Sequence, residues 1–202
     1  RGAIETGDWG SQLVRRYRFT ARLDRRRRAL TAVAACLGLF AMIGVGERSD
    51  VLAHLAGLGA GFALQGTTAA GAEVVHRLLA EQQVPLAGVR IVDGSGLSRL
   101  DRLTAESVVG MLRSSWLNQD LREILIASLP VAGRSGTLGR RMRGTTAAGR
   151  VRAKTGTLNV SSALSGYARR RYAFSIIQNG SPVSHFWARR AQDRFAAVLA
   201  AN

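Results

Sequence analysis

The chain has 202 residues, of which 47% are hydrophobic, and a formal net charge of +16. This length and hydrophobic content allow one substantial globular domain and argue against a disordered chain. A charge this large makes nucleic-acid binding a possibility to test against the sequence. The arginines, however, cluster at 15–28, 140–143 and 169–171 with few aromatic residues between them. No helix-turn-helix, zinc-finger or RNA-binding motif accompanies them. We therefore expect no nucleic-acid partner.

Cysteine and histidine usage gives no sign of a metal centre. The single cysteine, Cys36, excludes an internal disulfide. The three histidines, His54, His76 and His185, lack the spacing of metal ligands. We expect no metal and no cofactor.

The N-terminal part is basic and then strongly hydrophobic. Residues 1–28 form a basic segment that ends in a run of four arginines, and residues 29–46 contain one threonine and no charged residue. Such a stretch suffices to cross a bilayer core, and the flanking arginines would keep its N-terminal side in the cytoplasm. We expect a membrane anchor at 29–46, the alternative being a buried helix of a soluble protein.

A second hydrophobic stretch, residues 51–64, contains His54. An ionisable residue in such a run is a candidate functional residue, the alternative being a solvated histidine on a soluble helix. The sequence GERSDVLAHLAGLGAGFAL resembles the last transmembrane segment of rhomboid intramembrane serine proteases, and this resemblance covers about 25–66. It implies that His54 is a general base, although the rhomboid GxSG nucleophile segment is not in the sequence. Residues 29–66 are thus expected to form one or two membrane-like helices.

Residues 67–202 have the pattern of soluble helices and strands, which predicts an α+β domain. One helix is predicted to start at the N-cap Thr104 and to end near Trp116. A second is predicted to start at the N-cap Asn118 and to end before Pro130. The other predicted elements are helices at 69–83 and 183–201, and strands at 150–154, 163–168 and 172–178, the last two joined as a hairpin across 169–171.

The stretch VRAKTGTL, residues 151–158, holds the only lysine of the chain, Lys154. On a strand, Lys154 and Gly156 would share one face and Thr155 would lie on the other. Glycine in a strand marks a place where a ligand or another backbone comes close. Lysine is a compact, rotatable cation, whereas arginine is a planar fork, so a site that needs a small cation beside a hydroxyl explains the single lysine.

Four motifs occur in order and at close spacing: DGSGLSR (93–99), LPVAGRSGTL (129–138), RAKTGTL (152–158) and ALSGYA (163–168). Together they resemble the C-terminal part of the penicillin-binding D-alanyl-D-alanine carboxypeptidase/endopeptidase family, typified by penicillin-binding protein 4, over about residues 67–202. The resemblance implies part of a β-lactamase-like antiparallel sheet flanked by helices. It also implies a serine peptidase of the bacterial cell envelope whose partners are peptidoglycan peptide stems and β-lactams. The motifs of such enzymes are S-x-x-K, S-x-N and K-T-G.

The resemblance also implies roles for individual residues. Lys154 and Thr155 would bind the terminal carboxylate of the substrate. Gly156 would let the substrate lie against the strand, and the backbone N–H of Thr157 would donate to the oxyanion. The two other expected substrate contacts are Arg99 and Asn159.

The sequence departs from the family pattern at the nucleophile. Val151 stands three residues before the only lysine, so the sequence has no S-x-x-K motif, and we expect the chain alone to be unable to form an acyl-enzyme. Ser49 is a candidate remnant of S-x-N, though the rhomboid pattern, which fits without a gap, is slightly preferred there. The alternatives are a non-catalytic module that binds muropeptides or β-lactams, and a rhomboid fragment. One membrane span would place the C-terminal domain outside the cytoplasm, whereas two would return it.

Overall fold

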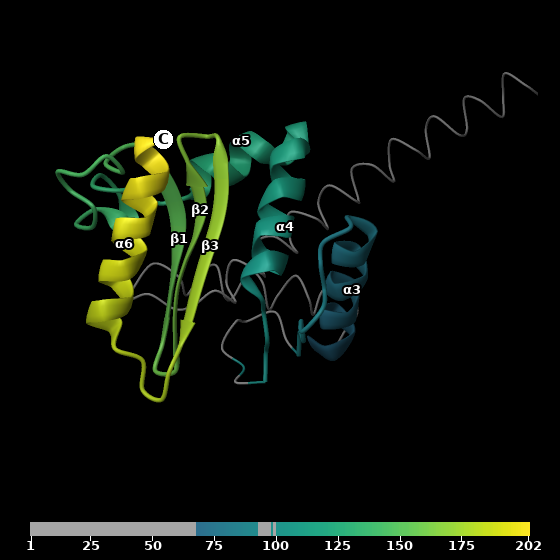
Figure 1. Cartoon of the computed structure of the whole chain (residues 1–202). Helices are drawn as coiled ribbons and strands as arrows, with labels where there is room; N and C mark the ends of the chain where they lie inside the picture. Colours follow the sequence, from purple (N-terminus) through teal and green to yellow (C-terminus); the bar gives the residue numbers. More distant parts are fainter. Residues whose placement is uncertain (1–67, 93–97, 99) are drawn as a thin grey trace, which may run out of the picture.

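The computed structural model describes residues 68–92, 98 and 100–202, and shows an antiparallel sheet between helices (Figure 1). The three strands are hydrogen-bonded in the order β1-β2-β3. Helix α6 covers one face of this sheet, α4 and α5 lie against the other, and α3 lies beyond α4 (Figure 1). The elements are α3 (Thr68–Glu81), α4 (Ala105–Leu117), α5 (Gln119–Ser128), the 3-10 helix η1 (Gly136–Leu138), β1 (Val151–Leu158), β2 (Ser161–Ala168), β3 (Tyr172–Asn179) and α6 (His185–Ala201).

Side-chain caps set the start of α4 and α5. The Thr104 hydroxyl accepts from the N–H of Ser107, while the Ser107 side chain accepts from the N–H of Thr104, which forms a capping box. The Asn118 side chain accepts from the N–H of Asp120 at the start of α5. Both N-caps were predicted from the sequence and are confirmed.

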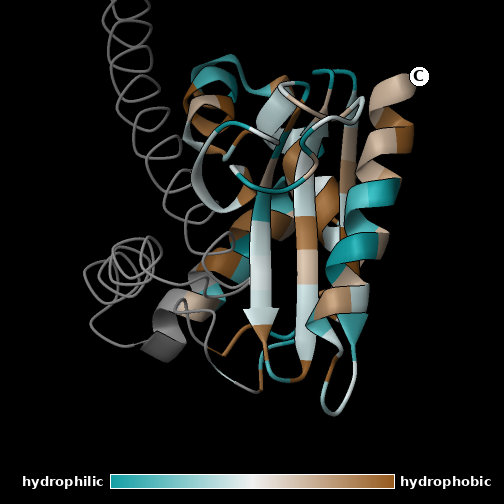
Figure 2. Cartoon of the chain, turned by 90° about the vertical axis from the view of Figure 1, so that its left-hand side faces the viewer, coloured by the Kyte–Doolittle hydropathy of each residue, from teal (hydrophilic) through white to brown (hydrophobic). Residues whose placement is uncertain are grey.

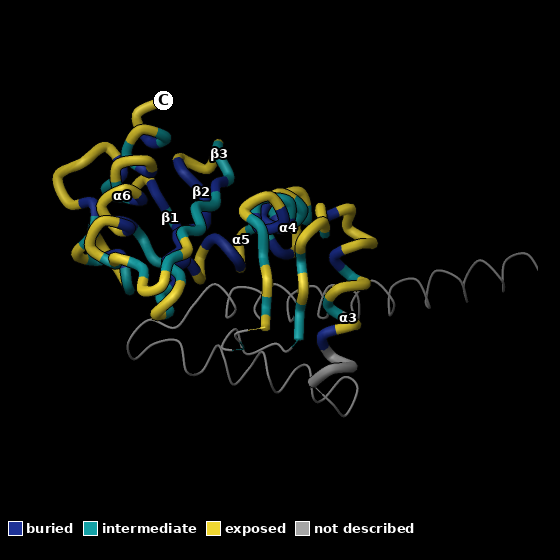
Figure 3. The backbone as a smooth tube through the Cα atoms, turned by 60° about the horizontal axis from the view of Figure 1, so that its bottom comes forward, coloured by how far each residue is buried: buried dark blue, intermediate teal, exposed yellow. Residues whose placement is uncertain are grey.

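The sheet has two different faces because successive residues of a strand point to opposite sides. Ala163 and Tyr167 of β2 pack with the buried residues of α4 and α5, whereas Leu164 and Ala168 pack with those of α6. Figure 2 shows hydrophilic and hydrophobic stretches along α6. Burial is concentrated on β1 and β2 between the helix layers (Figure 3). Because both faces of the sheet are packed against helices, a shift of one residue would move buried side chains to the wrong face, and this fixes the register of the three strands.

The predicted hairpin and closing helix are confirmed with small shifts of their ends. The strand predicted at 150–154 is longer than expected, since β1 continues through Gly156 to Leu158 and pairs with β2 along its full length. Ladder pairing and burial outweigh the low strand propensity of one glycine.

The membrane prediction concerns residues that the structure does not describe. Within the described part of the chain, no helix is long and apolar enough to cross a bilayer. The predicted spans at 29–46 and 51–64 both lie outside that part.

Candidate active site

The segment Lys154–Thr157 lies in the middle of β1, which is the outer strand of the described sheet. One edge of β1 pairs with β2, and the first half of the other edge is bonded to the loop before η1. There the N–H of Ala132 donates to the Val151 carbonyl at 2.9 Å, and the N–H of Ala153 donates to the Pro130 carbonyl at 3.0 Å. These two bonds show that the odd-numbered residues of β1 direct their backbone groups away from β2.

The second half of that outer edge carries the backbone groups of Thr155 and Thr157. Along an antiparallel strand, hydrogen bonding to one neighbour alternates with each residue. The N–H groups of Thr155 and Thr157 therefore point outward, as that of Ala153 does. Among the described residues, no backbone acceptor is recorded for either of them. The edge thus offers two donors, spaced by one residue, to a group lying beside β1.

Lys154 shares a face with Gly156, as the sequence predicted, because the β1–β2 register is continuous. The side chain is only 8% exposed, and its Nζ donates to the carbonyl of Thr155 at 2.7 Å. This carbonyl belongs to the outer edge, so the ammonium lies close to the row of outward N–H groups. A buried ammonium is costly unless oxygen atoms accept its protons, and the Thr155 carbonyl is one such acceptor.

Thr155 lies on the opposite face of β1, where its hydroxyl donates to Thr137 Oγ1 at 2.9 Å. Thr137 belongs to η1, and its contact holds the 129–138 loop against the centre of β1. A tight turn brings it there: Gly136 has φ +54°, and a Cβ at that position would lie 3.1 Å from Pro130. The sequence singled out this loop but not Thr137, because a contact between a loop and a strand depends on the tertiary fold.

Of the other residues that the sequence predicted for the site, two lie in the described part of the chain and two lie outside it. Thr157 is half-buried, and Asn159 is exposed in the turn after β1, where its carbonyl accepts from the N–H of Val183 at 3.0 Å. The structure therefore places Lys154–Thr157 and Asn159 on one continuous strand and turn. Arg99 and His54 lie outside the described residues.

Gln192 of α6 supports the end of β1 from the α6 face, and sequence reasoning missed it. Its amide is fully buried, and Nε2 donates to Ser162 Oγ and to Gln178 Oε1, both at 3.0 Å. Its Oε1 accepts from Arg141, at 3.0 Å. Ser162 is the cross-strand partner of Thr157. A glutamine at a buried position of an amphipathic helix is the signal that could have indicated it.

Within residues 154–158 of β1, Lys154 is the one charged residue. Arg141 also forms an ion pair with Asp193 at 2.7 Å behind the sheet. Within the described ranges, no group of three or more histidine, cysteine or acidic residues is arranged to hold a metal ion. The chemistry of the described edge is therefore that of one ammonium, threonine hydroxyls and outward N–H groups, which together suit an anionic oxygen.

Comparison with known proteins identifies the family. Residues 51–202 match the D-Ala-D-Ala carboxypeptidase 3 (S13) family of peptidases. The matched range covers well over half of the chain, and the chain belongs to this family. The match begins at residue 51 and so includes His54, which does not favour the rhomboid alternative for that stretch.

Curated relatives agree with this assignment. The chain is 46% identical over 123 residues to a D-alanyl-D-alanine carboxypeptidase from Actinomadura sp. (strain R39), covering 57% of this chain and 23% of that protein. It is 38% identical over 127 residues to carboxypeptidase DacB from Mycolicibacterium smegmatis, covering 57% of this chain and 26% of the relative. The matched part thus spans about a quarter of the length of these relatives.

Solved structures show the same fold. Penicillin binding protein 4 (dacB) from Haemophilus influenzae, in complex with a novel β-lactam, superposes with a TM-score of 0.61 at 22% identity, covering 80% of this chain and 40% of that one. A second structure of the same protein gives a TM-score of 0.60 at 24% identity, with 79% and 38% covered. The expected α+β arrangement of helices around an antiparallel sheet is confirmed.

Proposed function

We propose that this chain contributes the carboxylate-binding edge of a serine-type D-Ala-D-Ala carboxypeptidase/endopeptidase that acts on peptidoglycan in the bacterial cell envelope. The observation that carries the proposal is the outer edge of β1, where the Lys154 ammonium lies beside the outward N–H groups of Thr155 and Thr157. Family membership supports the same chemistry, and two relatives are named as carboxypeptidases.

In this proposal, a peptide stem lies along β1 with its terminal carboxylate at Lys154. The ammonium attracts the carboxylate, and the Thr155 hydroxyl, which donates to Thr137 in the structure without a ligand, would exchange this bond for one to the carboxylate. Gly156 leaves room for the ligand because it has no side chain. The N–H of Thr157 donates to the oxygen that becomes negative during acyl transfer, a contact worth about 3 kcal/mol in comparable enzymes.

The same edge would bind β-lactams, since their carboxylate and carbonyl present the same two groups to Lys154 and Thr157. The β-lactam in the complex of the Haemophilus influenzae protein supports this proposal at the level of the fold. Arg99 and Asn159 are proposed as further contacts to the peptide. Membrane attachment through 29–46, with the C-terminal domain outside the cytoplasm, is proposed as the route to peptidoglycan.

Calorimetric titration with a pentapeptide that ends in D-Ala-D-Ala tests the binding edge. Lys154→Ala removes a charge-assisted hydrogen bond, and we expect the affinity to fall by about tenfold or more. Lys154→Arg is the matched control for charge, and we expect it to bind weakly as well because the guanidinium is larger and planar. Equal affinities for the unchanged chain and Lys154→Ala would refute the proposed edge, provided that urea unfolding shows both proteins to be folded.

Acylation is tested separately. The sequence has one lysine and no S-x-x-K motif, so we expect these 202 residues alone to give no covalent band with a fluorescent penicillin on denaturing electrophoresis. A band that unlabelled β-lactam prevents from forming would contradict this expectation. The titration would still report on the edge of β1, because carboxylate binding does not require the nucleophile.

A further inference from the structure

A basic pocket lies at the start of β1, at the opposite end of the strand from Gly156 and Thr157. Its volume is about 440 Å³, and the residues that line it come from α5, the loop before β1, β1 itself and the β2–β3 hairpin. Arg152 and Tyr167 face each other across β1 and β2 in this pocket. The lining residues are Ile126, Gly149, Arg150, Arg152, Tyr167, Arg169 and Arg170.

Four of these seven residues are arginines, and none is acidic. The four guanidinium groups carry the same charge, so they repel one another across the pocket. A concave site lined by one sign of charge focuses the field and concentrates ions of the opposite sign. The pocket therefore favours an anion more strongly than the general positive charge of the chain does.

The arginines of the pocket fall into two pairs. Arg152 donates to the Ile126 carbonyl at 3.2 Å, and Arg170 pairs with Glu123 and lies over the ring of Trp116. These contacts hold two guanidinium groups in place before any ligand arrives.

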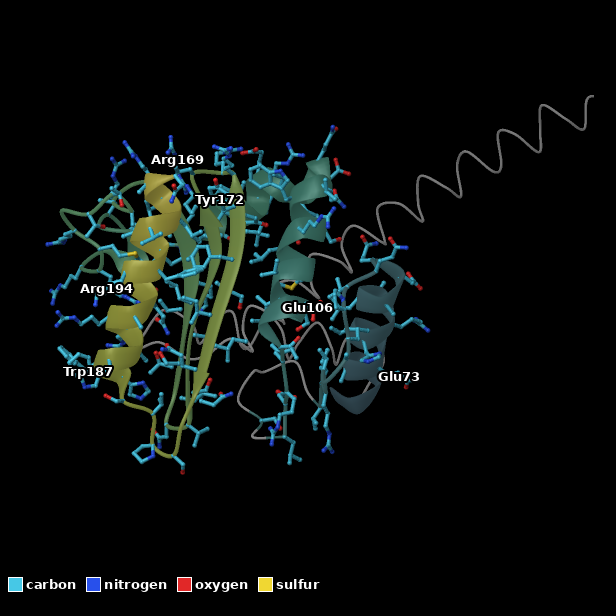
Figure 4. All side chains as sticks on the ribbon, in the orientation of Figure 1. Glu73, Glu106, Arg169, Tyr172, Trp187 and Arg194 are labelled. Carbon is cyan, nitrogen blue, oxygen red and sulfur yellow. The ribbon has the colours of Figure 1, made fainter. Side chains whose placement is uncertain are left out.

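Arg150 and Arg169 form the second pair and, like Arg170, are exposed. Their backbones are joined, since the N–H of Arg169 donates to the Arg150 carbonyl at 2.8 Å. Among the described residues, neither has a recorded carboxylate partner. Both side chains are therefore available to a ligand at the mouth of the pocket. Figure 4 shows Arg169 at the hairpin end of the sheet, on the other side of the molecule from Trp187.

The hairpin turn holds its arginines in an unfavourable backbone conformation. Arg169 and Arg170 have φ of 53° and 57°, the left-handed region that glycine and asparagine occupy most readily. Asn-Gly would suit these two positions better than Arg-Arg. A non-glycine residue in this region costs stability, and here both such residues of the turn line the pocket.

A fifth arginine lies against the wall of the pocket because Gly149 has no side chain. A Cβ on Gly149 would lie 2.7 Å from the guanidinium carbon of Arg134, and φ of this glycine is +71°. The missing Cβ thus lets Arg134 approach the backbone at the pocket. This placement adds one more cation to the same small region.

We propose that this pocket binds a phosphate-bearing ligand that carries at least two negative charges. The guanidinium fork matches the oxygen pairs of phosphate and carboxylate groups alike. A single carboxylate would leave most of the arginines uncompensated, whereas a phosphomonoester or pyrophosphate carries a charge of about −2 or more. The volume lies within the usual range of small-molecule sites and exceeds the need of a single ion. The proposal does not depend on the peptidase function.

Titration of the full chain with inorganic pyrophosphate at about 0.15 M salt tests the pocket, since this salt screens exposed charges beyond about 8 Å. The variant Arg150→Gln/Arg169→Gln removes the two exposed pocket arginines for which no carboxylate partner is recorded among the described residues. Its control, Arg189→Gln/Arg194→Gln, removes the same charge from the exposed side of α6, where Figure 4 shows Arg194 directed away from the sheet. We expect the pocket variant to lose about tenfold or more in affinity, and the control less than about threefold.

Three results would overturn the proposal: no binding of pyrophosphate, equal losses in the two variants, or a loss with Lys154→Ala and none with the pocket variant. Equal losses would mean binding by net charge alone, and the third result would place the anion at the peptide-binding edge.

Vesicles that contain phosphatidic acid, a phosphomonoester lipid, in phosphatidylcholine distinguish the two sources of such a phosphate. Vesicles that displace pyrophosphate from the unchanged chain, and bind the pocket variant less than the α6 control, would support the proposal with a lipid headgroup as the ligand. Pyrophosphate binding that vesicles leave unchanged would support it with a soluble phosphate ligand.

Discussion

Replacing Gln192 by leucine keeps the size of the side chain and removes its three hydrogen bonds to Ser162, Gln178 and Arg141. Ser162 is 1% exposed and loses a donor that water cannot replace, which costs about 1–3 kcal/mol. Gln178 and Arg141 are half-buried, so water compensates part of their loss, and Arg141 keeps its ion pair with Asp193. Leucine regains some of the loss by apolar burial, and we expect a net cost of about 2–3 kcal/mol.

Urea unfolding followed by circular dichroism measures this cost. Gln119→Leu is the matched control, because Gln119 is exposed on α5, and we expect its effect to remain within about 0.5 kcal/mol. We also expect Gln192→Leu to weaken peptide binding more than the control does, since Ser162 pairs with Thr157 at the end of β1. A loss of stability equal to that of the control would show that the buried network contributes nothing net, and would refute the reasoning.

Three further changes test the sheet and the pocket. Gly166→Ala would place a Cβ 2.2 Å from a backbone oxygen of β1 and 2.5 Å from the Cα of Ala153. We expect the free energy of unfolding in urea to fall by about 3 kcal/mol or more. An unchanged unfolding midpoint would contradict this close approach. Tyr167→Phe removes the buried bond from the phenol to the Leu112 carbonyl, at 2.7 Å; thermal unfolding should show a loss of about 1–2 kcal/mol, and a variant as stable as the parent would show that this bond has no net value. Arg169→Asn relieves the strain at φ 53°, so we expect a gain of about 0.5–1 kcal/mol together with several-fold weaker pyrophosphate binding, and lower stability would argue against strain.

Local chemistry made much of the secondary structure predictable. Thr104 and Asn118 cap their helices with their own side chains, so a few neighbouring residues suffice to locate each start. The strands β2 and β3 are joined by a three-residue turn, which keeps their pairing local in sequence. The alternation of faces along β1 also follows from the strand period alone, and it correctly separated Lys154 from Thr155.

Contacts between distant segments could not be predicted in this way. The Thr155–Thr137 bond joins residues 18 apart, and the Gln192–Ser162 bond joins residues 30 apart. Each depends on how a loop or a helix packs on the sheet. The arginine pocket is a similar case, because its lining comes from α5, β1 and the hairpin, and no short stretch of sequence shows that these meet.

The contrast between Arg152 and Lys154 explains why one strand of an arginine-rich chain keeps a single lysine. The two residues lie on the same face of β1, separated by one position, yet their environments differ. Arg152 extends from the start of the strand to the Ile126 carbonyl, where a long planar fork can reach α5 and still line the pocket. Lys154 turns back onto its own strand and places one Nζ at the Thr155 carbonyl, within a space that leaves it 8% exposed. A guanidinium bound to the same carbonyl would need room for its second nitrogen beside the outer edge, which also carries the N–H of Thr157. Arginine at 154 would therefore occupy the proposed binding edge, whereas lysine leaves it open.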